Sequence, residues 1–389
     1  MSDEAQLPNG SEDLPTKKPS AVVKPLMELQ PAKENDGNTL LGNRFLCRGG
    51  GGLLIGPTGI GKSTAIIQMG ICWSVGMECF SIAPAQPLKI LYIQSENDEG
   101  DLCEMRDGVL EHLKLNPKKR KRLDRNFTCV FESSRAGGDF ITETLEPLLQ
   151  KHSPDLVILD PALAYIGGNA SEQETVGTFL RNLLNPVLQT HKCGVLIVHH
   201  TPKPNGDGKA KNKLATDFAY AGLGSVEWSN WARFILVLSA RQENGVRELR
   251  VAKRPRLGWK DALGQPCFTR LLRQNSEGGA LYYAELSPEE AMAMDGKLTP
   301  LQQFQGSGIF AVPGEEIAKD ALIAKIAEKK ICGLNTARKV VVELLISEGY
   351  VEELEKPRST GRPQKWLRRT DKQRNRTSFV SVERHLLPG

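Results

Sequence analysis

The chain has 389 residues, 40% of them hydrophobic and 25% charged, a composition typical of globular proteins that bury a sizeable core. No apolar run approaches the roughly 18 residues that a membrane-spanning helix needs, and the opening Met1-Ser2-Asp3-Glu4 lacks the features of a signal peptide. We therefore expect a cytoplasmic protein of about two to three domains without a membrane partner. The net charge of +5 permits nucleic-acid binding without requiring it, so the placement of the charges decides.

The first part of the chain divides into a leader and a large α/β region. Residues 1–37 are rich in Pro, Asp, Glu, Lys, Asn and Ser, which predicts a disordered leader. From 38 to 286, short apolar runs alternate with helical patterns, which is typical of a mainly parallel sheet covered on both faces. The expected strands are 53–55, 90–93, 156–159, 195–198, 234–238, 248–252 and 280–286.

A second, small domain is expected at the C-terminal end. Residues 287–314 have no sustained periodicity and predict a linker. Apolar residues then recur at helical spacing in 315–328 and 335–348, and extended segments follow at 350–354 and 364–367. Two helices feeding a hairpin are the pattern of a winged helix, which we expect at 315–370, with a basic tail at 371–389.

The eight cysteines are scattered and form no C-x-x-C pair. A zinc site needs clustered ligands, and this spacing does not supply them. We therefore expect reduced thiols and no zinc site.

A phosphate-binding loop is the clearest motif. The segment 56–63 reads G-P-T-G-I-G-K-S and fits the pattern G-x-x-x-x-G-K-[ST], with a predicted strand before it and a helical run after it. Backbone N–H groups of such a loop, together with the helix N-terminus, bind phosphate oxygens. Lys62 is expected to reach the β- and γ-phosphates of ATP and Ser63 to ligate Mg²⁺. The nucleotide-binding residues are Gly56, Pro57, Thr58, Gly59, Ile60, Gly61, Lys62, Ser63 and Thr64.

Two carboxylates at the ends of predicted strands can complete this site. Asp160 ends the 156–159 strand, where it can hold Mg²⁺ together with Ser63; the alternative is an ordinary strand-terminating Asp before a proline. Glu96 follows the 90–93 strand and is the candidate general base for the attacking water. The competing acidic residues Asp98, Glu99 and Asp101 are better suited to begin the next helix.

Adjacent histidines, His199 and His200, close the 195–198 strand. His200 at that edge can sense the γ-phosphate by hydrogen bonding and act on the loop that follows. The alternatives are a metal site or a pair of imidazoles with a purely structural role. Ligand-spaced carboxylates or thiols are missing around the pair, which disfavours a metal.

The combination of motifs resembles the RecA-like P-loop ATPases of the AAA family, and within them the RepA-like hexameric replicative helicases of plasmids and phages. The resemblance covers about 38–286 and rests on the segments 56–64, 91–96, 156–161, 195–201, 222–225 and 253–258. It implies a twisted, mainly parallel sheet, a homo-oligomeric ring, expected to be a hexamer, and ATP with Mg²⁺ bound between neighbouring subunits. It also implies a basic residue that reaches the neighbour's γ-phosphate, with Arg254 and Arg256 as candidates and Lys253 as a substitute. Pro255 departs from the family pattern and leaves the choice among the three open.

Three basic regions are candidates for contact with DNA. The loop 202–213 follows the His pair, where RecA-like folds place DNA-gripping loops, and single-stranded DNA would pass through the ring. The run 118–122 is read as a solvated peripheral turn, with DNA contact as the alternative. The predicted winged helix would bind duplex DNA, although many winged helices mediate protein contacts instead. The candidate residues are Lys209, Lys211 and Lys213 in the loop, and Arg338, Lys339, Arg362 and Lys365 in the winged helix.

Together these features predict an ATP-dependent motor acting on DNA, a RepA-like replicative helicase. The alternatives are a RecA- or RadA-like recombination or repair ATPase, and a regulator in which ATP switches DNA binding without movement. A small-molecule P-loop kinase is disfavoured by the predicted DNA-binding domain.

Overall fold

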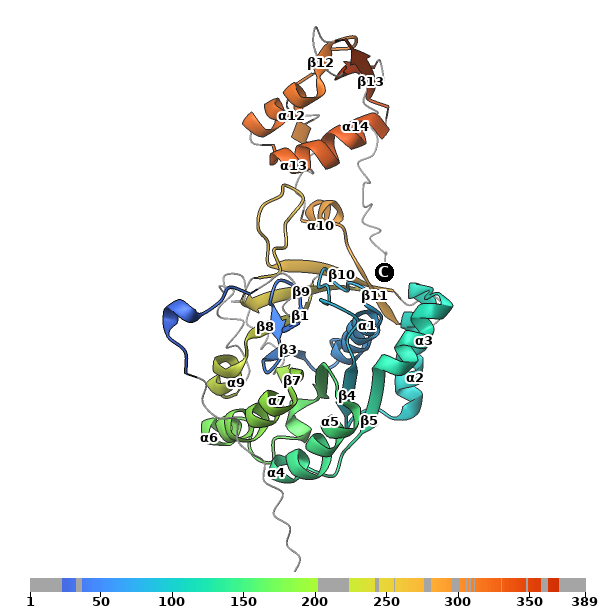
Figure 1. The fold of residues 1–389 in the computed structure, drawn as a ribbon. Helices are drawn as coiled ribbons and strands as arrows, with labels where there is room; N and C mark the ends of the chain where they lie inside the picture. The colour runs from blue at the N-terminus through green and yellow to red at the C-terminus, as the bar shows by residue number, and fades with distance from the viewer. Residues whose placement is uncertain are drawn as a thin grey trace, which may run out of the picture. The chain divides into compact units, whose positions relative to one another are not determined.

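The computed structural model describes residues 23–32, 37–201, 224–241, 245–254, 256–275, 281–295, 301, 303–304, 307, 309–310, 312–329, 331–347, 349–357 and 363–370. The chain divides into two compact units (Figure 1). The larger comprises Met1–Gly258 and Phe268–Glu285, and the smaller comprises Trp259–Cys267 and Leu286–Gly389. None of the described helices is long and apolar enough to cross a membrane.

A mixed sheet forms the centre of the larger unit. Within the described residues its nine strands run in the order β11-β10-β9-β8-β3-β7-β6-β4-β5. The strands from β8 to β5 are parallel, and β9, β10 and β11 extend the sheet in antiparallel fashion. This mostly parallel α/β sheet confirms the predicted fold class of the large region. The bounds are β3 Gly51–Pro57, β4 Ile90–Gln94, β5 Phe127–Phe131, β6 Leu156–Asp160, β7 Gly194–Thr201, β8 Phe234–Ala240, β9 Val246–Lys253, β10 Thr269–Asn275 and β11 Tyr282–Glu285.

Helices pack on this sheet because its central strands are apolar on both faces: every residue of β4 and β6 is buried. On one side lie α1 Lys62–Val75, α2 Glu99–Leu113 and α3 Pro117–Asn126 (Figure 1). The other face carries a core in which Leu53, Phe140 and Tyr165 are fully buried. The elements on this side are α4 Gly137–Asp139, η2 Phe140–Leu145, α5 Glu146–His152, α6 Gln173–Gly177, η4 Thr178–Leu184, α7 Asn185–His191 and α9 Val226–Trp231.

The smaller elements of this unit lie outside the large sheet. Strands β1 Thr39–Leu41 and β2 Leu46–Cys47 form a separate antiparallel pair. The single turn η3 Ala162–Ala164 follows β6. Within the leader predicted to be disordered, the 3-10 turn η1 Leu26–Glu28 is described and has no buried residue.

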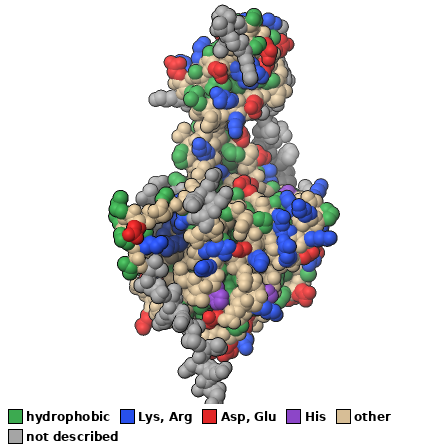
Figure 2. Space-filling model, viewed as in Figure 1, with side chains coloured by type: hydrophobic (Ala, Val, Ile, Leu, Met, Phe, Trp, Pro, Cys, Tyr) green, Lys and Arg blue, Asp and Glu red, His purple; other side chains and the backbone are tan. Residues whose placement is uncertain are grey.

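One local prediction for this unit is wrong, and one strand was missed. The basic run 118–122 is not a turn: it lies within helix α3, because Asn116 caps the helix through Lys119 N–H at 2.9 Å and Pro117 is suited to the first helical position. Figure 2 shows Lys and Arg side chains gathered over this helix. Strand β10 was not predicted, because polar residues flank the two leucines of its sequence T-R-L-L-R-Q-N; it pairs with β9 and β11.

In the smaller unit, two helical segments and a three-stranded antiparallel sheet pack around one core. Helix α12 Lys319–Glu328 starts later than expected, because Glu316–Ala318 form strand β12 and pair with β14. The sheet order is β12-β14-β13. Phe304 and Phe310, from the segment expected to be a linker, are buried in this core. The remaining bounds are α10 Pro288–Met294, α13 Leu334–Thr336, η7 Ala337–Val342, α14 Glu343–Ser347, β13 Val351–Lys356 and β14 Gln364–Arg369.

Candidate nucleotide-binding site

The candidate residues converge because parallel strands end at the same edge of a sheet. In the register of β3 with β7, Gly56 lies opposite His200, and in that of β4 with β6, Gln94 lies opposite Asp160. Strand order places β6 between β7 and β4. The P-loop, the segment with Glu96, Asp160 and the His pair therefore meet at the carboxyl edge of the sheet, which is where ligands bind in open α/β sheets.

The loop itself depends on glycine at specific positions. Gly59 and Gly61 have φ of +77° and +94°, a region that disfavours any side chain. A Cβ on Gly56 would lie 2.4 Å from the carbonyl oxygen of Leu238, so strand β8 leaves no room for one. Helix α1 begins at Lys62 without a side-chain cap. The first amides of α1 therefore remain available to an anion.

Lys62 is buried, with 4% of its surface exposed, and three acceptors surround its ammonium. Its Nζ lies 2.9 Å from the carbonyl oxygens of Gly56 and Pro57 and 2.9 Å from Nδ1 of His200. Burial lowers the pKa of Lys62, and the negative charges of Asp160 and Glu96 oppose that change. The ammonium is thus held by three neutral acceptors, which the charged oxygens of a phosphate can replace.

Asp160 is 2% exposed and accepts a hydrogen bond from the hydroxyl of Tyr92 at 2.9 Å. Burial raises the pKa of Asp160, while hydrogen bonds from Tyr92 and Ser63 act in the opposite direction. A buried carboxylate beside a hydroxyl is an oxygen donor set that suits Mg²⁺, and a bound cation would stabilise its charged form. The residues present therefore fit the expected metal.

Glu96 lies on the turn that follows β4, with 53% of its side chain exposed, and its Oε1 is 3.7 Å from Nε2 of His200. Its acidic neighbours Asp98 and Asp101 cap the following helix instead. Asp98 caps α2 by accepting from Asp101 N–H at 2.8 Å, and Asp101 in turn accepts from Asp98 N–H at 3.3 Å. Of the acidic residues in this segment, Glu96 thus remains to face the P-loop.

The two histidines have different surroundings. Burial, followed by the charge of Lys62, lowers the pKa of His200, which favours a neutral ring. His199 is 4% exposed, donates from Nδ1 to the carbonyl oxygen of His200 at 2.7 Å, and packs against the ring of Trp228. In the part of the chain that the structure describes, no three His, Cys, Asp or Glu residues are grouped as a metal site.

Sequence reasoning missed the residues that hold the site residues in place by hydrogen bonds. Gln94 is 1% exposed; its side chain donates to the carbonyl oxygen of Asn97 and accepts from Asn97 N–H, both at 2.8 Å. These two bonds clamp the turn that carries Glu96. The amide of Gln94 and the phenol of Tyr92 gave no motif, because their partners are set by the register of β4 and β6.

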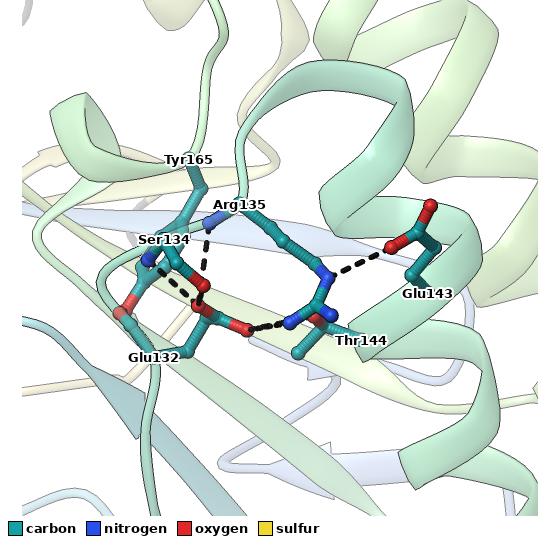
Figure 3. A network of polar contacts seen from close by, with 6 residues as sticks. All are labelled: Glu132, Ser134, Arg135, Glu143, Thr144 and Tyr165. Atoms are coloured by element: carbon teal, nitrogen blue, oxygen red, sulfur yellow. Dashed lines mark hydrogen bonds and ion pairs between the residues drawn. The ribbon is translucent and has the colours of Figure 1, made fainter.

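A carboxylate network lies at the neighbouring end of β5 (Figure 3). Glu132 accepts from Ser134 N–H and Oγ at 2.7 and 2.6 Å and from Thr144 Oγ1 at 2.8 Å. Hydrogen bonds from Ser134 are the main reason that the pKa of Glu132 is lowered to about 2. Arg135 bridges Glu132 and Glu143, at 3.3 and 2.9 Å. The backbone N–H of Glu132 donates to the carbonyl oxygen of Gln94 at 3.0 Å. This bond connects the network to the turn that carries Glu96.

The three basic residues proposed to act on a neighbouring subunit lie at the other end of the parallel strands, away from the P-loop. Lys253 ends β9, where it pairs with Ile235 at the start of β8. Strand β3 runs the whole height of the sheet from Gly51 to Pro57, roughly 20 Å at the usual rise per residue. Arg254 and Arg256 therefore cannot reach the P-loop of their own chain.

The candidate DNA-binding residues divide by location. Lys209, Lys211, Lys213 and Arg362 lie outside the described residues. Arg338 and Lys339 are exposed on η7. Lys365 on β14 is exposed and pairs with Glu353 at 2.6 Å.

The fold and the loop geometry define this protein as one with a P-loop ATPase core. A family model described as an AAA domain matches residues 24–206. The chain is also similar to the crystal structure of the RadB recombinase, with 16% identity and a TM-score of 0.35 over 60% of this chain and 90% of that chain. A similarity of this size supports no statement about function. No curated protein matches the chain.

Proposed function

We propose that the protein is an ATP-dependent motor acting on DNA, a RepA-like replicative helicase that hydrolyses ATP at the interfaces of a hexameric ring. The observation that carries the hydrolytic part is the meeting of Lys62, His200 and Glu96, with contacts of 2.9 and 3.7 Å, beside the buried Asp160. Nucleotide phosphates would lie on the P-loop backbone from Gly56 to Thr64, and Ser63 and Asp160 would hold Mg²⁺, which neutralises phosphate charge.

In this proposal each side chain performs a separate task. Lys62 exchanges its carbonyl acceptors for phosphate oxygens. Glu96 accepts the proton of the attacking water, which is consistent with its position at the open edge of the sheet. His200 loses Lys62 as its hydrogen-bond donor in the same exchange. This change signals phosphate binding along β7 to the loop 202–213. Lys209, Lys211 and Lys213 in that loop would bind single-stranded DNA.

The smaller unit is proposed to be a winged helix that binds duplex DNA. Its two helical segments and three-stranded antiparallel sheet support this, and Arg338 and Lys339 are exposed on the second helical segment. Arg362 and Lys365 would contribute from the hairpin. The boundaries proposed are 38–286 for the ATPase domain, 287–314 for the linker and 315–370 for the winged helix.

The decisive experiment is a strand-displacement assay with ATP and Mg²⁺, combined with measurement of the oligomer mass. ATP-dependent unwinding by a hexamer is expected, and Lys62→Ala should abolish both unwinding and ATP turnover. Turnover that survives in Lys62→Ala would refute the site. DNA-stimulated hydrolysis without unwinding would instead favour a recombination or repair ATPase, and ATP-dependent DNA binding without turnover would favour a regulator.

Duplex binding is tested separately in the full chain. The double variant Arg338→Ala/Lys339→Ala should weaken duplex binding and reduce its salt dependence by about two phosphate contacts. Basal ATP hydrolysis should be unchanged. Lys325→Ala, an exposed lysine on α12, is the matched control. Unchanged duplex affinity in the double variant would contradict the assignment of the smaller unit.

A further inference from the structure

The antiparallel extension of the large sheet contacts the P-loop. Strands β9 and β11 each direct one polar side chain at the same group, the carbonyl of Ile60. Nε of Arg247, on β9, donates to this oxygen at 3.2 Å, and the hydroxyl of Tyr283, on β11, lies 3.2 Å from it. The same hydroxyl is 3.4 Å from the carbonyl oxygen of Gly61. Two side chains outside the nucleotide-binding motif therefore contact its backbone.

Tyr283 is held in place by helix α1, which lies beside β11 (Figure 1). The side chain of Gln68 donates from Nε2 to the carbonyl oxygen of Tyr283 at 2.7 Å and accepts from its N–H at 2.8 Å. Gln68 and Tyr283 are 4% and 3% exposed, so these two bonds fix β11 to the helix that begins at Lys62. Burial raises the pKa of Tyr283, against the opposing charge of Arg247, so the phenol keeps the proton that it donates.

Arg247 is oriented by its own strand and by the next one. Its Nη2 donates to Oε1 of Gln274 on β10 at 3.0 Å, and its Nη1 donates to the carbonyl oxygen of Val246 at 3.4 Å. Strands β9 and β10 pair with Arg247 opposite Leu272, which sets the position of the side chain along the sheet. The guanidinium is thus fixed while its Nε faces the P-loop.

The direction of one amide follows from these contacts. In a trans peptide, the carbonyl of one residue and the N–H of the next point to opposite sides. Because the Ile60 carbonyl faces Arg247 and Tyr283, the Gly61 N–H points away from them. Within the part of the chain that the structure describes, this N–H has no acceptor. It is therefore available to an anion at the start of α1.

Glycine makes such outside support necessary. A Cβ on Gly61 would lie 2.0 Å from the Tyr283 hydroxyl, and the φ of +94° also disfavours a side chain. A glycine, however, adopts positive and negative φ about equally well, so the peptide group before it can turn at little cost. Contacts from outside the loop are needed to keep that peptide in one orientation.

We infer that Arg247 and Tyr283 are positioning residues for the bound nucleotide: by holding the Ile60 carbonyl, they keep the Gly61 N–H directed at a phosphate oxygen. The inference rests on the proposed binding of ATP at the P-loop, and it gives the antiparallel extension a role in that binding. A donor that is already oriented binds an anion without the cost of ordering the loop. Since both side chains hold one oxygen, either alone preserves much of the orientation. Loss of both should therefore cost more than the two single losses combined.

The test measures the binding of ADP with Mg²⁺ to the full chain by calorimetry. Tyr283→Phe and Arg247→Met should each raise Kd by about threefold, and the double variant should raise it by about 30-fold, above the product of about ninefold. Tyr282→Phe is the matched control on the same strand: its ring stacks on His112 with centroids 3.8 Å apart, and loss of its hydroxyl should leave Kd unchanged. A wild-type Kd in the double variant, or single losses that merely multiply, would overturn the proposal.

ATP turnover separates positioning from damage to the fold. In the double variant KM for ATP should rise together with Kd, while kcat falls less than about threefold, because Lys62 and Glu96 are unchanged. Arg247→Lys in the Tyr283→Phe background should recover part of the affinity, since an ammonium can also donate to the Ile60 carbonyl. A fall in kcat with an unchanged KM would overturn the proposal. Failure of the proposed function gives a different result, in which ADP binding and ATP turnover both survive in Lys62→Ala.

Discussion

The ammonium of Lys62 lies 2.9 Å from Nδ1 of His200. Because an ammonium group can only donate, Nδ1 accepts and the proton of a neutral imidazole is on Nε2, which faces Glu96 at 3.7 Å. One histidine thus joins the P-loop to the candidate general base. If another donor or a phosphate took the place of Lys62 next to His200, the hydrogen bonding of both Lys62 and His200 would change.

Tyr92→Phe should make the requirement for Mg²⁺ depend more strongly on pH. The Tyr92 hydroxyl opposes the rise that burial causes in the pKa of Asp160, so its loss should raise that pKa further. The protonated carboxyl binds a cation poorly, so the Mg²⁺ concentration for half-maximal ATP turnover should rise in the variant, and rise more at low pH than at high pH. Parallel pH profiles for variant and wild type would contradict a role of Tyr92 at Asp160.

Gln94→Ala should reduce turnover without loss of nucleotide binding. The variant removes both bonds that clamp the turn around Asn97, so Glu96 would sample more positions. We expect kcat to fall about tenfold, with KM within about twofold of wild type. Gln150→Ala, on the exposed surface of α5, is the control. An equal change in KM and kcat would indicate damage to the P-loop rather than to the turn.

His199 should make the larger unit less stable as the pH falls. Burial lowers the pKa of His199 to about 4, below its ordinary 6.5. Between these values the unfolded chain binds a proton that the folded chain lacks, so the free energy of unfolding falls as pH decreases through 6.5 and is unaffected above it. The contribution is about 2 kcal/mol between about pH 7.5 and pH 5. Urea unfolding of wild type and His199→Gln should therefore show the smaller pH dependence in the variant; equal slopes would contradict this.

Glu132→Ala should destabilise the larger unit by about 2–3 kcal/mol. The N–H of Ser134, the N–H of Arg135 and the hydroxyl of Thr144 would lose their carboxylate acceptor in a buried place. Thermal unfolding measures the loss. Glu143→Ala removes only the exposed partner of Arg135 and should cost less than about 0.5 kcal/mol. If the two variants were equally stable, the network would have no role in holding the end of β5.

The order of apolar runs was enough to predict an α/β fold, because continuous apolar strands of four or five residues require cover on both faces. It did not predict β10, in which Arg and Gln residues flank only two leucines. It also did not predict the helical state of the run 118–122, where a cap at Asn116 outweighs the repulsion of neighbouring charges. The late start of α12 has a similar cause: pairing of Glu316–Ala318 with β14 overrides their helical spacing.

By itself the sequence determined the P-loop and the residues that end strands, since a glycine loop before a helix, or an acid after an apolar run, depends only on neighbours along the chain. Tertiary structure alone decided which of these residues meet. Strand order and register bring Lys62, His200 and Asp160 to one edge, attach Gln94 and Glu132 to the turn of Glu96, and bring Arg247 and Tyr283 to the Ile60 carbonyl. The physical reason is that backbone hydrogen bonds between strands fix distances that no local pattern contains.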